Sequence, residues 1–225
     1  MSDAVTEGID VENVASWLCK HVSGVNPPLK YQLIAGGHSN LTYRVEDQEE
    51  NLYVLRRPPL GHVLATAHDM AREHRIISAV GNTDVPVPPT LGVCEDDGVN
   101  GAPFYVMEYV DGEVLHSDAE ATLVPVSERV DLSRQVVEVL AELHAIEPED
   151  IGLGDLAKRE DYLGRQLRRW SRQWEQSKTR ELEAMEEVQD LLERRKPEQI
   201  GSTIVHGDYR LGNMLTRSGR ILAVL

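Results

Sequence analysis

The stretch "IVHGDYRLGNML" (residues 204–215) carries a His, a Gly and an Asp at the end of a short apolar run. Asn213 follows five residues after Asp208, and a second apolar run, "RILAVL" (220–225), comes next. Short strands are predicted at 202–207 and 220–225, on either side of a loop. An aspartate in such a loop can orient an alcohol or accept its proton, and an asparagine side-chain oxygen suits Mg²⁺. An Asx-turn with an exposed Asp is the simpler alternative.

The composition is that of a globular protein with one large domain or two small lobes. Of the 225 residues, 41% are hydrophobic and 27% are charged. The formal net charge of −15 argues against nucleic-acid binding, which requires a basic surface, and slightly favours cationic partners.

The cysteines and the N-terminus favour a cytoplasmic protein without a membrane partner. Cys19 and Cys94 lie far apart and lack metal-site spacing, which favours two free thiols over a disulfide or a zinc site. The start, "MSDAVTEGID", lacks the basic and apolar segments of a signal peptide. No apolar run approaches the length of about eighteen residues that a membrane span requires.

The first half of the chain is predicted to be rich in strands, and the second half to be helical. A first helix is expected at 10–23, with Asp10 as its N-cap. Strands and one inserted helix follow at 31–34, 41–47, 51–59, 66–80 (the helix), within 85–96 and at 102–112. Three helices are expected at 127–146, 160–177 and 180–195. The first is predicted to bury a stripe from Val130 and Val137 to His144, and the second to pack Trp170 and Trp174 between helices.

The segment "AGGHSNLTYRV" contains a candidate phosphate-binding turn. Gly36 and Gly37 lie between two predicted strands and precede Ser39 and Asn40. Glycines let a backbone approach a ligand closely, and successive N–H groups bind phosphate oxygens. An ordinary hairpin turn explains the same residues, because Gly-Gly is a common turn pair. Neither a Walker loop nor a dinucleotide-binding fingerprint is present.

The segment "YVLRRPP" ends a predicted strand with two arginines. Arg56 and Arg57 must point to opposite faces of the strand, so one can face an anion while the other faces water. An inward-facing arginine needs a phosphate or a carboxylate, and Glu73 on the next helix is a candidate partner. Two surface arginines are the simpler interpretation of this pair alone.

In chain order, these motifs resemble the aminoglycoside phosphotransferase and choline-kinase-like family, which has a protein-kinase-like fold. The resemblance covers about residues 30–225 and rests on "GGHSNLTYRV", "YVLRRPP", "AREHRII", "APFYVMEYVDG" and "HGDYRLGNML". The chain looks most like the branch whose relatives include domains fused to acyl-CoA dehydrogenases. A two-lobed α+β fold is implied, with an antiparallel-sheet lobe at 1–108 that begins with a helix and linker (1–29). A mainly helical C-terminal lobe at 109–225 would be truncated at its end.

The resemblance implies that the first lobe binds ATP or GTP. The loop residues Gly36, Gly37, Ser39 and Asn40 would cover the nucleotide phosphates. Arg56, paired with Glu73, would occupy the place of the usual phosphate-contacting lysine, and its planar fork would contact phosphates differently. Backbone groups would hold the adenine edge at Glu108, Tyr109 and Val110.

The resemblance also implies that Asp208 is the catalytic base and that Asn213 binds Mg²⁺. A second metal ligand of the family, an Asp directly after the second short strand, would be the residue that follows Leu225. We therefore expect the chain to be a truncated version of a longer protein, whose remaining helices shape the acceptor site.

The predicted function is transfer of the γ-phosphoryl group of ATP or GTP to a hydroxyl of a small molecule. A nucleotide-binding pseudokinase without catalysis is the alternative, which Arg56 and the missing Asp motivate. An interaction domain that uses the acidic helices is a third hypothesis. The sequence does not identify the acceptor or the oligomeric state.

Overall fold

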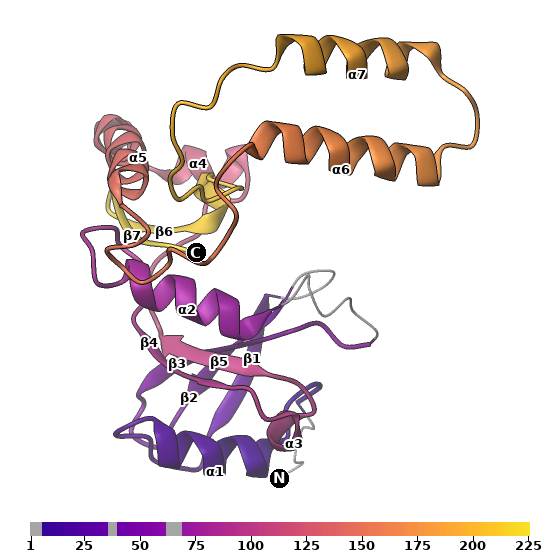
Figure 1. The fold of residues 1–225 in the computed structure, drawn as a ribbon. Coiled ribbons are helices and arrows are strands. Elements are labelled where there is room, and N and C mark those ends of the chain that lie inside the picture. The colour runs from indigo at the N-terminus through magenta and orange to yellow at the C-terminus, as the bar shows by residue number, and fades with distance from the viewer. Residues whose placement is uncertain (1–5, 36–39, 62–68) are drawn as a thin grey trace. The chain divides into compact units, whose positions relative to one another are not determined.

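The structure, a computed structural model, describes residues 6–35, 40–61 and 69–225. The chain forms two compact units, one from Met1–His144 together with His206–Leu225 and the other from Ala145–Val205 (Figure 1). The division into lobes predicted at residue 108 stays a prediction. Among the described helices, none is long and apolar enough to cross a membrane.

The first unit is built on a five-stranded sheet with the strand order β1-β2-β3-β5-β4. Every neighbouring pair in the sheet is antiparallel, as predicted for an α+β fold. The strands are β1 (Lys30–Ala35), β2 (Leu41–Glu46), β3 (Leu52–Arg57), β4 (Thr90–Cys94) and β5 (Phe104–Glu108). A short helix, α3 (Asp97–Asn100), connects β4 to β5.

Two helices cover opposite faces of this sheet, α1 (Val11–His21) on one and α2 (Met70–Val80) on the other (Figure 1). Asp10 caps α1 as predicted, because its carboxylate accepts from the Asn13 N–H at 3.1 Å. On the α1 face, Val14 and Leu18 are fully buried against aromatic and branched side chains of Tyr43, Val45, Leu55, Phe104 and Val106.

The helix predicted at 66–80 begins at Met70, where Asp69 caps it through the Arg72 N–H at 2.9 Å. Its residues before Asp69 lie outside the described part of the chain. On this second face, Met70 packs with Val54, Tyr105 and Met107.

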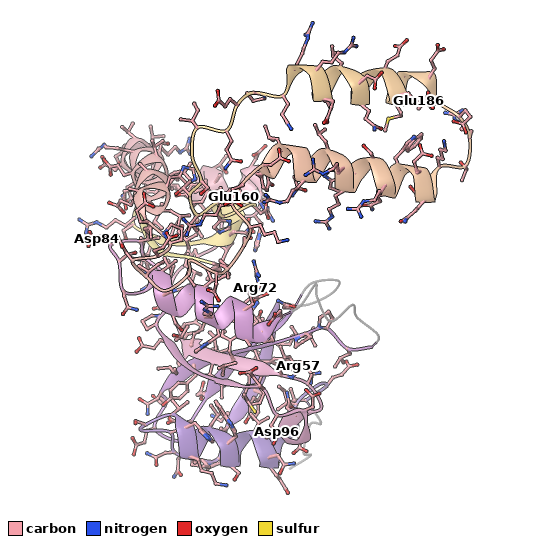
Figure 2. All side chains as sticks on the ribbon, viewed as in Figure 1. Arg57, Arg72, Asp84, Asp96, Glu160 and Glu186 are labelled. Atoms are coloured by element: carbon pink, nitrogen blue, oxygen red, sulfur yellow. The ribbon has the colours of Figure 1, made fainter. Side chains whose placement is uncertain are left out.

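The two arginines that end β3 point to opposite faces, but neither points to water. Arg56 lies on the α2 face beside Glu73. Arg57 is buried on the α1 face, with 6% of its surface exposed (Figure 2). Arg57 donates hydrogen bonds to the carbonyl oxygens of Gly8, Pro58 and Asn100. The expectation of a water-facing second arginine was therefore wrong. Backbone carbonyls solvate this guanidinium, and burial lowers the pKa of Arg57.

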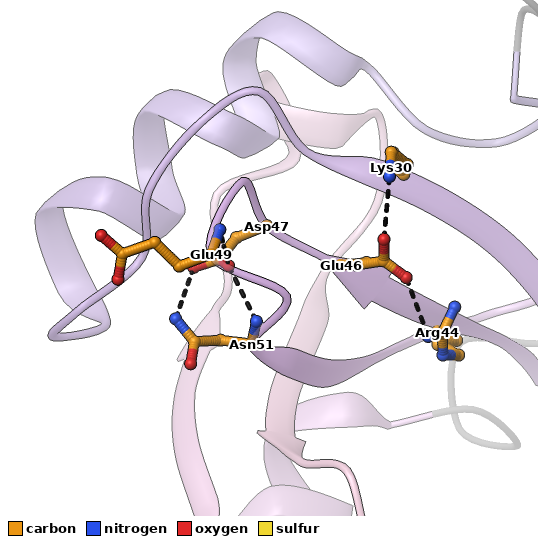
Figure 3. A network of polar contacts seen from close by, with 6 residues as sticks. All are labelled: Lys30, Arg44, Glu46, Asp47, Glu49 and Asn51. Atoms are coloured by element: carbon orange, nitrogen blue, oxygen red, sulfur yellow. Dashed lines mark hydrogen bonds and ion pairs between the residues drawn. The ribbon is translucent and has the colours of Figure 1, made fainter.

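A buried carboxylate organises the turn between β2 and β3. Asp47 is 2% exposed and accepts hydrogen bonds from the N–H groups of Asn26, Glu49 and Asn51 and from the Asn51 side-chain amide, at 2.9–3.1 Å. Figure 3 shows this network beside the Lys30–Glu46–Arg44 ion pairs of β1 and β2. Burial alone would raise the pKa of Asp47, but these hydrogen bonds outweigh it and lower the pKa.

The strand predicted at 202–207 is absent, and the hairpin lies entirely after the quoted loop. Residues 202–207 pair with no other strand in the part of the chain that the structure describes, and Val205 is 70% exposed. The hairpin consists of β6 (Met214–Arg217) and β7 (Arg220–Val224). Its two-residue turn has positive φ at Ser218 and Gly219, as tight hairpins favour. The loop and β6 are joined by a single turn of 3-10 helix at Leu211–Asn213.

Two further helices of this unit are α4 (Asp118–Leu123) and α5 (Val126–Ala145). The stripe predicted to be buried on α5 was wrong, since Val130 and Val137 are 70% and 67% exposed. Gln135 holds the opposite stripe against the hairpin, donating to the Gly219 carbonyl at 2.9 Å and accepting from the Ile221 N–H at 3.2 Å. Both stripes are apolar, so periodicity could not distinguish them. The buried side chains of α5 are Leu132, Val139 and Leu143.

The second unit contains α6 (Tyr162–Ser177) and α7 (Glu183–Arg195), which lie side by side (Figure 1). Asp161 joins their ends, because its carboxylate pairs with Arg168 at 2.8 Å and with Lys196 at 3.1 Å. Trp170 is 58% exposed, so its predicted packing between helices was wrong for this residue. Two helices that have chiefly each other as partners bury little of their apolar surface, and α7 has no buried residue among those described.

We predict that Val14→Ala lowers the free energy of unfolding of the first unit by about 2 kcal/mol, because it leaves a cavity under the sheet. The matched control is Val11→Ala on the same helix, where the side chain is 41% exposed and the loss should be far smaller. Urea denaturation of the two variants measures the difference. Equal losses would show that α1 does not form part of the core.

We also predict that Asp47→Asn destabilises the protein in a pH-dependent way. The pKa of Asp47 is lower in the folded protein than its usual value of 3.8. The contribution of Asp47 to the free energy of unfolding is therefore complete above pH 3.8 and is lost as the pH falls through the pKa of the folded protein. The difference in denaturation midpoint from wild type should be largest near neutral pH and shrink in acid. Asp84→Asn, at an exposed loop position, is the control and should show no such dependence.

Candidate active site

The loop at 206–213 is held in place by a histidine and a glycine. Gly207 has φ +90°, a conformation that favours glycine, and the chain turns there. The Asp208 N–H donates to His206 Nδ1 at 3.2 Å, while His206 Nε2 lies 2.9 Å from the carbonyl oxygen of Leu225. These partners place a ring proton on Nε2 and make His206 a bridge between the loop and the residue after β7.

Asp208 and Asn213 are in direct contact. The Asn213 amide nitrogen donates to Asp208 Oδ2 at 2.7 Å and to the Asp208 carbonyl oxygen at 2.9 Å. Arg210 Nε donates to the same Oδ2 at 3.2 Å. These contacts, led by Asn213 and then Arg210, lower the pKa of Asp208. Within the described residues nothing donates to Asp208 Oδ1 or to the side-chain oxygen of Asn213.

The rest of the first unit anchors this loop from two directions. The Tyr209 hydroxyl donates to the Val136 carbonyl of α5 at 2.7 Å. The Leu225 N–H donates to the Asn213 carbonyl at 2.9 Å, which ties the loop to the residue after β7. Sequence reasoning missed Tyr209, whose signal is an aromatic residue beside the loop Asp.

A second polar cluster surrounds Glu73 on α2. Its carboxylate lies 3.5 Å from Arg56 Nε and accepts from Asn40 Nδ2 at 2.7 Å and from the Tyr105 hydroxyl at 3.4 Å. The structure therefore brings Arg56 and Glu73 together, as the sequence motifs suggested, and adds Asn40 as a second partner of Glu73, which the sequence did not indicate. Tyr105 was missed, although it pairs directly with Arg56 across β3 and β5. Burial raises the pKa of Tyr105, so its hydroxyl stays protonated and able to donate.

Only some of the other residues predicted to bind the nucleotide lie in the described part of the chain. Gly36, Gly37 and Ser39 lie outside the described residues. Glu108 ends β5 and is exposed, and its N–H donates to the Pro89 carbonyl at 2.8 Å. Tyr109 packs on the α2-face cluster, and the carbonyl of Val110 accepts from the Gly112 N–H at 3.0 Å. Two backbone groups of Glu108–Val110 are therefore already engaged within the protein.

The segment after β5 is fastened to the hairpin that follows the loop. Glu113 and Thr216 exchange two backbone hydrogen bonds of 2.8 Å, and Asp111 forms an ion pair with Arg217. Gly112 permits this approach, since a Cβ there would lie 2.9 Å from the Leu215 Cβ. The segment after β5 and the hairpin that follows the loop at 206–213 are thus joined by a direct backbone bridge.

The side-chain atoms of Asp208 and Asn213 that could bind a cation are oxygens, and oxygen ligands suit Mg²⁺ rather than zinc. Across the described ranges, no group of three His, Cys, Asp or Glu side chains forms a metal site. Asn213 and Asp208 are the oxygen-bearing pair in the loop.

A family model, the phosphotransferase enzyme family, matches residues 30–225. The chain belongs to this family. Helix α1, at Val11–His21, precedes the span that the family model matches.

Relatives of this phosphotransferase-family chain include acyl-CoA dehydrogenase family member 10 of Mus musculus, 35% identical over 88% of the chain. Acyl-CoA dehydrogenase family member 11 of Homo sapiens is 30% identical over 96% of the chain. The chain spans only 18% of the first protein and 28% of the second.

Solved structures of phosphotransferases share the fold. A Ralstonia eutropha protein assigned to the aminoglycoside phosphotransferases is 35% identical, with a TM-score of 0.80 over 96% of this chain and 64% of that one. The streptomycin–ATP complex of APH(2")-IIa is 19% identical, with a TM-score of 0.67 over 97% of this chain and 70% of that one. The expected two-part, kinase-like α+β architecture is therefore confirmed.

We predict that Tyr209→Phe lowers the free energy of unfolding of this phosphotransferase-family chain by about 1 kcal/mol, because the Val136 carbonyl loses its hydrogen bond. Tyr162→Phe is the matched control, since the described residues supply no partner for its hydroxyl, and it should be neutral. Chemical denaturation of both variants checks the difference, and equal effects would contradict an anchoring role for the Tyr209 hydroxyl.

Proposed function

We propose that the chain is the nucleotide-binding part of a phosphotransferase that moves the γ-phosphoryl group of ATP or GTP to a hydroxyl of a small molecule. The observation that carries this proposal is the contact between Asp208 and Asn213 on the loop of a phosphotransferase-family chain. The hydrogen bonds from Asn213 and Arg210 fix one carboxylate oxygen and leave the other for an acceptor.

Asp208 would orient the acceptor hydroxyl through Oδ1 and take its proton. The acceptor oxygen then bonds to the γ-phosphorus as the bond to the β–γ bridging oxygen breaks, and a nucleoside diphosphate leaves. The lowered pKa keeps Asp208 ionised at neutral pH, which suits a group that orients a hydroxyl more than it acts as a strong base.

Mg²⁺ would be held by Asn213 through its side-chain oxygen, and the ion would offset negative charge on the phosphates.

The Glu73 cluster would bind the nucleotide. Glu73, which pairs with Arg56, would hold this arginine for the phosphates. Asn40 donates to Glu73, and the residues that precede it in the chain, Gly36, Gly37 and Ser39, would cover the phosphates. The backbone at Glu108–Val110 would meet the adenine edge. Solved structures with this fold hold ATP or GDP, which supports nucleotide use. A cytoplasmic location and a small-molecule acceptor complete the proposal.

We predict that Asp208→Ala in the longest natural form of the protein lowers kcat by about 10²–10⁴-fold with an accepted alcohol. The affinity for Mg·ATP, measured by calorimetry, should persist because the Glu73 cluster is unchanged. Asp84→Ala, an exposed loop position, is the control and should leave both quantities unaltered. Turnover that survives Asp208→Ala undiminished would refute the assigned role.

A non-catalytic nucleotide-binding module is the second candidate function, favoured by Arg56 in place of the usual lysine. It predicts measurable Mg·ATP binding without phosphoryl transfer to any alcohol in the same protein. A protein that binds no nucleotide would contradict both candidates.

A further inference from the structure

A cavity of about 460 Å³ lies at the C-terminal end of α1, beside the ends of β3, β4 and β5. Its lining includes residues 21–23 from the end of the helix, residues 51–53 at the start of β3, and Glu108 at the end of β5. A volume of this size is in the range that holds a small ligand. The described residues of the Glu73 cluster and of the loop at 206–213 do not line it, so the cavity is separate from the candidate active site.

Tyr53 and Glu108 reach this cavity from neighbouring strands. Tyr53 is buried in the core under α1 together with Phe104 and Val106 of β5. Glu108 follows Val106 by two residues along the same strand, so its side chain points to the same face of the sheet. Tyr53 and Glu108 are also direct partners in the β3–β5 pairing, which places their Cβ atoms about 5 Å apart. A phenol and a carboxylate therefore lie side by side at the cavity.

Neither of these polar groups has a hydrogen-bond partner in the part of the chain that the structure describes. Tyr53 is only 9% exposed, yet its hydroxyl is not among the fully enclosed polar atoms, so this oxygen belongs to the part that remains accessible. Glu108 is exposed, and its carboxylate forms no ion pair with a described residue. Because the hydroxyl of a buried tyrosine usually has a partner, the pair points to a ligand that contacts both groups.

The charges around the cavity favour a cation. The C-terminal end of α1, which lines it, carries the negative end of the helix dipole. Burial raises the pKa of Tyr53, and the carboxylates of Asp47 and Glu49, in the turn before β3 (Figure 3), raise it further. The phenol therefore stays protonated in a negative environment. The described lining contains no lysine or arginine, and Lys20 in the last turn of α1 is not part of it.

The remaining wall of the cavity is partly apolar. Val22 is buried, Leu52 and Leu91 are half-buried, and all three line the cavity. A short hydrocarbon chain would cover these side chains while a charged group at its end met Glu108. The lining thus combines an acidic end with an apolar wall, which is the complement of an alkylammonium ion.

We propose that this cavity binds a small organic ammonium ion. The ammonium group donates to the Glu108 carboxylate and to the Tyr53 hydroxyl oxygen, and the hydrocarbon part packs on Val22, Leu52 and Leu91. The site lies on the face of the sheet that α1 covers, whereas Glu73 and Arg56 lie on the α2 face. Occupation of the cavity therefore does not require phosphoryl transfer.

The test is NMR titration of the 225-residue chain with n-butylammonium chloride, at constant ionic strength and without nucleotide. The backbone amide signals of residues 22–23, 51–53 and 108 should shift in a saturable way. 1-Butanol and sodium butyrate have the same four-carbon length without a positive charge. Both should bind at least about tenfold more weakly, because neither offers a charge-assisted hydrogen bond to the carboxylate.

Two substitutions examine the polar contacts. Glu108→Gln keeps the size of the side chain but removes its charge, and it should weaken butylammonium binding about tenfold. Tyr53→Phe removes only the hydroxyl and should weaken binding about fivefold. The matched control is Glu12→Gln in the first turn of α1, which makes the same charge change at an exposed position about 14 Å along the helix from His21. Its affinity should equal that of wild type.

The site would be overturned by the absence of saturable shifts in wild type, or by equal affinities for butylammonium and 1-butanol. An unchanged affinity in Glu108→Gln would overturn it as well, and an unchanged affinity in Tyr53→Phe would remove the hydroxyl from it. Glu108 is exposed, so its replacement leaves the fold intact. A failure of the proposed function appears instead as absent Mg·ATP binding in calorimetry, which leaves this titration unaffected.

Discussion

The backbone bridge between Glu113 and Thr216 is the contact on which the rest of the first unit depends. It joins the segment leaving β5 to the strand that follows the loop at 206–213, and Gly112 makes the approach possible. Among the described residues, the β6–β7 hairpin pairs with itself and at this bridge, and the Val224 N–H adds a hydrogen bond to the Pro86 carbonyl at 2.8 Å. One polar cluster, around Glu73, lies on the sheet side of this bridge, and the other, around Asp208, lies on the hairpin side, so the bridge helps to fix their relative position.

Local sequence patterns predicted the parts of this site that local geometry controls. The spacing of Asp208 and Asn213 spans one turn, so a contact between them follows from the chain itself. Strand alternation placed Arg56 and Arg57 on opposite faces, and the family resemblance assigned Arg56 as the partner of Glu73. Family resemblance supplied the architecture, which neither pattern determines.

Tertiary contacts decided what the sequence could not. The sequence alone suggested that Arg57 lies at the surface. Its actual partners are backbone carbonyl oxygens, which every residue has, so no side chain in the sequence could identify them. Which of the two apolar stripes of α5 is buried depends on the β6–β7 hairpin, to which Gln135 is hydrogen-bonded. The strand expected before the loop failed for a related reason, because an apolar segment becomes a strand only where a neighbour can pair with it.

The burial of Arg57 shows that the segment before residue 30, where the family match begins, contributes to the structure of the first unit. The family match begins at residue 30, yet Gly8 supplies one of the carbonyls that solvate this cation, and α1 covers the same face of the sheet. A version of the chain trimmed to the matched span would expose an apolar face and leave a charged group short of an oxygen ligand, one residue from Arg56. The part of the chain that packs as one unit with the sheet is thus longer than the span that the family model matches.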